Sequence, residues 1–104
     1  MTKTELASVF MKKTAKWPHG TLVVPVDQNE KSSVRTIFTN DVHGKSVSAV
    51  KSYWQQQIFS GRDVPPVEKS SEAQVIAFVK ANAGAVAYVS DTADVSGTKT
   101  ITVR

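Results

Sequence analysis

The chain has 104 residues, 40% of them apolar and 21% charged, which suits one globular domain over residues 1–104 and excludes a disordered chain. It has no cysteine, which excludes disulfides, thiolate metal sites and thiol nucleophiles. No apolar run approaches the roughly 20 residues of a membrane span, and the net charge of +4 indicates a mildly basic surface.

The first two predicted elements are a helix and a strand. Thr2 and Glu5 have the spacing of a capping box, and apolar residues then recur at helical intervals. Residues 22–27 are rich in valine and predict a strand. Pro25 lacks an N–H group, which favours an edge position or an interrupted ladder for that strand.

Two further helices are predicted in the middle of the chain. Ser32 or Ser33 can cap the first of them, and Gly44 is placed to end it. Ser46 can cap the second, which has Gly61 after its end. In both segments the apolar residues recur every three or four positions, so each helix has one apolar face.

The last third of the chain predicts a helix and two strands. Ser71 and Gln74 repeat the capping-box spacing, and Gly84 closes that helix. Residues 85–90 are apolar and predict a buried strand, and residues 100–103 alternate as a final strand would. This order predicts the α/β class, with a small mixed sheet covered by about four helices. The predicted core consists of Ile58, Phe59, Val75, Phe78, Val79, Val86 and Tyr88.

The sequence contains no catalytic or metal-binding motif. His19 and His43 are not spaced as paired metal ligands, and no nucleophile elbow, Walker loop or dinucleotide-binding glycine motif is present. We therefore expect no enzyme activity, no cofactor and no metal. Interleaved aromatic and basic residues on one face, which nucleic-acid binding requires, are also missing, so we expect no nucleic-acid partner.

Residues 26–35 form the most informative stretch, because a strand ends there and a helix begins after a short polar turn. Backbone N–H groups and the helix dipole make such a helix start attractive to an anion. Nearby hydroxyl, amide and cationic side chains would add donors and charge. The candidate oxyanion site consists of Gln28, Lys31, Ser32, Ser33, Val34 and Arg35. The alternative is that the serines only cap the helix with their own side chains.

Three blocks of sequence, at 5–20, 24–38 and 53–89, together resemble the bacterial substrate-binding proteins of phosphate ABC transporters. The first contains Trp-Pro-x-Gly, the second Val-Pro-Val-Asp-Gln, and the third ends in Asn-Ala-Gly-Ala-Val-Ala-Tyr-Val. The resemblance covers most of the chain. It implies the fold of one lobe of a type 2 periplasmic binding protein and a periplasmic location.

The same resemblance implies phosphate or another small oxyanion as ligand, and a transporter or other envelope protein as partner. It also implies that the signal peptide, the first strand and the second lobe of such proteins are missing here. No segment is apolar enough for a membrane span.

The departures from the family pattern fall on the candidate site. The family's phosphate-contacting segment is typically Arg-Ser-x-Gly-Ser-Gly-Thr. Here Gln28 replaces the arginine, Lys31-Ser32-Ser33 replaces Gly-Ser-Gly, and Val34 replaces the threonine. Two hypotheses follow. The chain is a non-enzymatic domain that binds an oxyanion weakly, or it is a structural or protein-interaction module that keeps the fold and has lost the ligand site.

Overall fold

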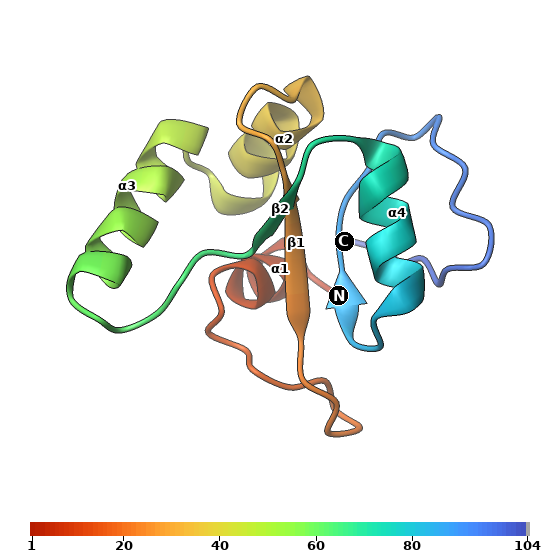
Figure 1. The fold of residues 1–104 in the computed structure, drawn as a ribbon, viewed down its shortest axis with the longest axis horizontal. Coiled ribbons are helices and arrows are strands. Elements are labelled where there is room, and N and C mark those ends of the chain that lie inside the picture. The colour runs from red at the N-terminus through yellow and green to blue at the C-terminus, as the bar shows by residue number, and fades with distance from the viewer. Residues whose placement is uncertain (104) are drawn as a thin grey trace.

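The computed structural model describes residues 1–103, which form α-helices around a three-stranded sheet (Figure 1). The elements are α1 (Lys3–Phe10), β1 (Val24–Gln28), α2 (Ser33–Phe38), the π-helical turn η1 (Thr39–His43), α3 (Val47–Phe59), β2 (Val67–Lys69), α4 (Glu72–Ala81) and β3 (Ala85–Val86). The predicted α/β class is confirmed. All four predicted helices are present, and Thr2, Ser32, Ser46 and Ser71 cap them.

The sheet has the order β2-β1-β3, and both pairings are parallel. The predicted mixed sheet is therefore wrong for the described residues, because β2 and β3 are each reached through a helical crossover rather than a hairpin. Of the two alternatives predicted for this strand, the edge position is wrong, since β1 is central, and the interrupted ladder agrees with the observed pairing. Pro25 is tolerated because Val24 donates its N–H to Gly84 on the β3 side, so the next nitrogen faces β2. Pairing with β2 begins only at Val26.

The strand predictions differ from the structure in three places. The strand predicted over residues 85–90 is shorter, because β3 ends at Val86. Residues 100–103 form no strand, although their alternation is typical of one. Conversely, β2 follows a Pro-Pro pair and is too short to show periodicity, so its sequence did not predict it. Its pairing with the end of β1 makes it a strand, which is a tertiary effect.

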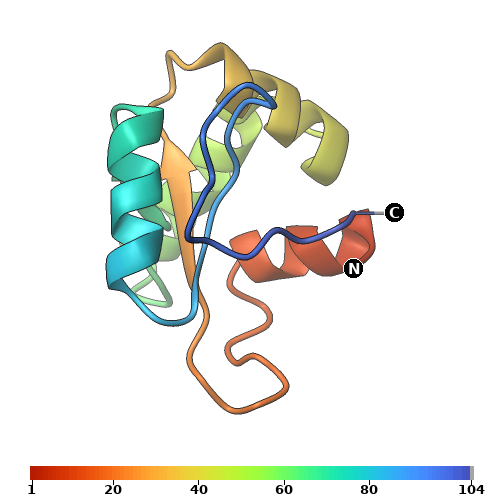
Figure 2. The same cartoon turned by 90° about the vertical axis from the view of Figure 1, so that its right-hand side faces the viewer.

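The helices cover both faces of the sheet (Figure 2). Helix α4 lies on one face, and α1 lies on the other with the α2–η1 segment beside it. Helix α3 stands apart at the β2 side of the molecule, joined to β2 by an extended loop (Figure 1). The β1 end that leads into α2 is thus enclosed, whereas α3 presents most of its surface outward.

The core is centred on α1. Leu6, Val9 and Phe10 are buried against Val86, and Phe38 meets the Phe10 ring edge-on with 4.9 Å between centroids. Of the predicted core, Val75 and Val86 are buried, and Phe78, Val79 and Tyr88 are half-buried. Ile58 and Phe59 are a wrong prediction, since they are 52% and 95% exposed. Ile58 follows the apolar spacing of α3 but lies near its exposed end, whereas Phe59 lies off the stripe of the buried Val50 and Trp54.

The backbone geometry at position 84 requires a glycine. Its φ of +85° is in the left-handed region, and a Cβ built there would lie 2.1 Å from the carbonyl oxygen of Leu22. The Gly84 carbonyl also accepts a 2.9 Å hydrogen bond from Nε1 of Trp17. The close approach lets β3 enter the sheet beside β1, which brings Tyr88 to the end of β1.

Candidate functional site

Polar side chains gather where β1 and β2 end, at the carboxyl edge of the sheet. In this strand order the chain leaves β1 toward β2 and later crosses back to β3, so ligands of α/β proteins are expected near this edge. We call these side chains the polar cluster. Its members are Asp27, Gln28, Ser32, Arg35, Glu68 and Tyr88.

Three of the predicted site residues form hydrogen bonds to one another within this cluster. The Ser32 hydroxyl donates to Oε1 of Gln28 at 2.7 Å and accepts from the backbone N–H of Arg35 at 3.2 Å. The Gln28 amide donates to the Tyr88 carbonyl at 2.8 Å. Nη1 of Arg35 donates to the Gln28 carbonyl at 2.9 Å. These donors are already used, as the capping alternative requires.

Arg35 is 4% exposed and sits between two carboxylates. Its Nη1 lies 3.1 Å from Oε2 of Glu68, and its Nη2 lies 3.9 Å from Oδ2 of Asp27. Its Nε is buried without a hydrogen-bond partner within residues 1–103. One guanidinium facing two carboxylates leaves no excess positive charge for an anion at this position.

Burial also sets the titration of the cluster. The pKa of Asp27 is raised, chiefly because burial disfavours its charged form, although hydrogen bonding by Tyr88 and the charge of Arg35 oppose the rise. The Tyr88 hydroxyl donates to Oδ1 of Asp27 at 2.6 Å. Burial and that carboxylate raise the pKa of Tyr88, so its hydroxyl stays protonated and remains a donor.

The other three predicted residues take no part in the hydrogen bonds and ion pairs of the polar cluster. Lys31 and Ser33 are exposed, and Val34 is half-buried. The backbone N–H of Lys31 donates to Oδ1 of Asn29 at 2.9 Å, which holds the turn before α2. Two hollows open on the surface, one along α3 and one beneath residues 95–103, and none of the six predicted residues lines either.

Asp27, Glu68 and Tyr88 belong to the cluster although sequence reasoning did not assign them to a site. Asp27 had a usable signal, because an acidic residue at the end of a valine-rich strand is buried only with a partner. Glu68 had none, since its strand was not predicted. Tyr88 lies about 60 positions from its partners, a distance that periodicity cannot bridge.

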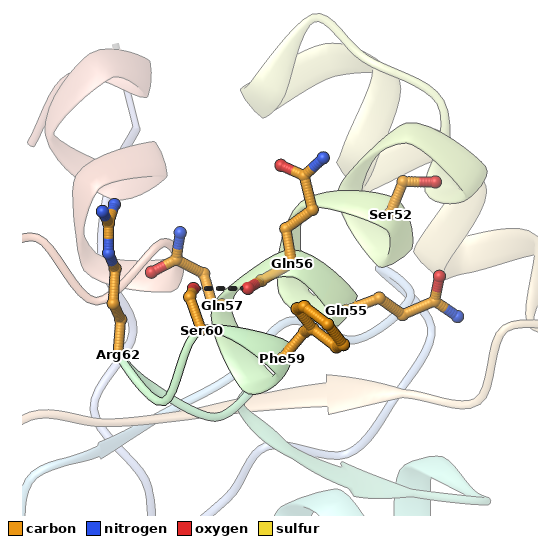
Figure 3. A pocket seen from close by; sticks show the side chains of 7 residues that line it. All are labelled: Ser52, Gln55, Gln56, Gln57, Phe59, Ser60 and Arg62. Atoms are coloured by element: carbon orange, nitrogen blue, oxygen red, sulfur yellow. Dashed lines mark hydrogen bonds between the residues drawn. The ribbon is translucent and has the colours of Figure 1, made fainter.

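A second feature is the outward face of α3, which we call the α3 face and define as Ser48, Ser52, Gln55 and Phe59. These residues are all exposed and follow one another at four-, three- and four-residue intervals, so they form one stripe. The only charged residue of α3 is Lys51, whose ammonium is paired with Glu30. Figure 3 shows Phe59 and the glutamines of this helix projecting from the ribbon, with Arg62 beyond its end.

Comparison of the chain with families of proteins, with curated proteins and with solved structures finds no match. Within residues 1–103, no helix is both long and apolar enough to cross a membrane. In the same residues, histidine and acidic side chains form no group of three that could hold a metal ion. The geometry of the chain itself therefore has to support any functional conclusion.

Proposed function

We propose that this chain is a non-enzymatic interaction module, related to one lobe of a phosphate-binding-type protein, that has lost its ligand site and self-associates through α3. The α3 face is the observation that supports it. An exposed helix face ordinarily bears charged residues, whereas this one has none and ends in a phenylalanine that is 95% exposed. Depletion of charge around an exposed aromatic residue is typical of the centre of an interface.

The polar cluster supports the loss of the ligand site. Ser32, Gln28 and Arg35 would have to exchange their internal hydrogen bonds for an anion. The entering charge would also meet Asp27 and Glu68 beside the guanidinium. Removing a satisfied partner from a buried polar group costs about 1–3 kcal/mol. A structural role for the cluster, which ties α2 to β1 and β2, has no such cost.

The partner in this proposal is a second copy of the chain. Although the molecule has a net charge of +4, none of the four residues of the α3 face is charged, and Arg62 lies beyond its Phe59 end. Its residues are small at the N-terminal half and bulky at the C-terminal end. In an antiparallel pair, Phe59 of each copy would lie over Ser48 of the other, and Ser52 would face Gln55. Such a self-complementary stripe is what a two-fold interface requires.

We expect the chain to dimerise weakly, with a dissociation constant on the order of 100 µM, because a single helix pair buries less surface than a standard interface. Sedimentation velocity from about 10 µM to about 1 mM should show the transition. Phe59→Ser should weaken dimerisation at least tenfold. Ile37→Ser is the matched control, since Ile37 is 68% exposed but lies on α2. A chain that stays monomeric at the highest concentration, or two variants that behave alike, would contradict self-association.

Phosphate titration tests the lost ligand site. At about 50 mM phosphate, a concentration that saturates even a millimolar site, we expect no saturable amide shifts in residues 28–36. The reason is that the donors there are bonded to one another. Sodium chloride at matched ionic strength is the control for general salt effects. Saturable shifts confined to these residues, and reduced in Ser32→Ala and Lys31→Ala, would instead support the oxyanion-binding hypothesis.

A further inference from the structure

A large apolar groove lies beneath the C-terminal segment, away from both the polar cluster and the α3 face. We call it the tail groove. Its volume is about 600 Å³, which is within the range of small-molecule sites. Its walls come from distant parts of the chain, and Figure 2 shows the last residues passing in front of β3 and then along α1. The apolar residues that line it include Leu6, Val75, Val79, Val86, Ile101 and Val103.

The wall contributed by the tail is only loosely attached. Residues 91–103 form no helix or strand. The N-terminal amino group donates to the Thr102 carbonyl at 3.3 Å, and the Thr98 N–H donates to Val95 within the tail. Ile101 and Val103 remain 44% and 40% exposed while lining the groove. Closing the tail over an apolar molecule would bury both side chains and would break no ladder of hydrogen bonds.

The charged residues that line the groove indicate which polar group an otherwise apolar ligand should have. Lys99 lines the groove and forms no ion pair with any residue from 1 to 103. The one acidic residue of the lining, Asp41, is already paired with Lys3 at 2.6 Å. His19, also in the lining, accepts a hydrogen bond from the Thr21 N–H through Nδ1. Among residues 1–103, the unpaired charge of the groove lining is therefore positive.

We propose that the tail groove binds a small amphipathic acid, with an apolar body against the α1, α4 and β3 side chains and a carboxylate or sulfonate at Lys99. Apolar surface supplies most of the affinity, and the ammonium orients the ligand. The tail acts as a strap that closes over the body of the ligand. This site does not depend on the proposed self-association, because none of the residues of the α3 face lines it.

Binding of decanoate to the intact chain tests the proposal. The binding is measured by displacement of the fluorescent sulfonate 8-anilinonaphthalene-1-sulfonate. We expect saturable decanoate binding with a dissociation constant on the order of 100 µM. Decanol, which has the same body without the charge, should bind more weakly. Near-ultraviolet circular dichroism of the same samples shows whether the chain remains folded, since partly unfolded proteins also bind this dye.

Three variants test the contributions of the charge and of the apolar surface separately. Lys99→Glu should weaken decanoate binding about fivefold or more at low salt, and Lys13→Glu, an equal change at an exposed lysine outside the groove, should leave it unaltered. Ile101→Ser should weaken decanoate and decanol alike, because it removes apolar surface from the strap. Absence of saturable binding, or equal effects of Lys99→Glu and Lys13→Glu, would overturn the proposal.

Discussion

Replacing Arg35 with alanine should lower the free energy of unfolding by about 3–5 kcal/mol near neutral pH, because it leaves a buried carboxylate without its cation. Arg35 is 4% exposed, and Asp27 is 8% exposed. The substitution also deprives the Gln28 carbonyl of its 2.9 Å hydrogen bond from Nη1. Urea unfolding, followed by tryptophan fluorescence, measures the loss.

The loss in the Arg35→Ala variant should shrink as the pH falls below neutral. The folded-state pKa of Asp27 is raised above its ordinary value. The protonated carboxyl group therefore contributes to the stability of the folded state at low pH, and this contribution is lost as the pH rises through that pKa. Removing the guanidinium takes away an influence that lowers this pKa, which moves the window upward. Lowering the pH should therefore reduce the loss of stability in the variant, because it protonates the carboxyl group that has lost its partner.

Lys31→Ala is the control for the Arg35 substitution. Lys31 is a predicted site residue of the same charge, but it is exposed. Its replacement should change the free energy of unfolding by less than about 0.5 kcal/mol. If Arg35→Ala were equally mild, or if its cost did not depend on pH, the cluster would not hold the fold together as described.

Phe10→Ala should be comparably destabilising, by about 3–5 kcal/mol, because it empties the centre of the core. Phe10 is 2% exposed, and its ring lies 4.9 Å from that of Phe38 and 5.7 Å from that of Tyr88. The same substitution at Phe59, which is 95% exposed, should cost less than about 0.5 kcal/mol in the monomer. Unfolding at low protein concentration compares the two. Similar costs would place Phe59 in a core that the structure does not show.

The helices were predictable because their signals are local. At Thr2, Ser46 and Ser71 a side-chain oxygen accepts from the backbone three residues on, and that spacing is visible in the sequence. The sheet was less predictable, since a strand such as Val67–Lys69 exists through its pairing with β1. The exposure of Ile58 could not be foreseen either, because apolar spacing shows which face of a helix is apolar but not whether anything covers it. Phe59 had a usable signal, since it lies off the stripe formed by Val50 and Trp54.

The local structure around the candidate site was predictable, yet the bonding of its residues could not be foreseen. Strand end, turn and helix start lie where the polar pattern indicated. Whether Ser32 and Arg35 face solvent or one another depends on Glu68 and Tyr88, which come from later crossovers. Donor type is a property of the sequence, whereas donor availability is a property of the packing.

The wholly parallel sheet has a consequence for how the chain folds. Strand β1 pairs with residues roughly 40 and 60 positions later, so neither pairing is local, and closing such long loops precedes any gain from the ladder. Helices form within microseconds or faster, whereas the sheet has to wait until both crossovers have docked. Refolding should thus be limited by the encounter of β1 with β2 and β3. During that interval the valine-rich β1 has two unpaired edges, which makes the half-folded chain its most aggregation-prone form.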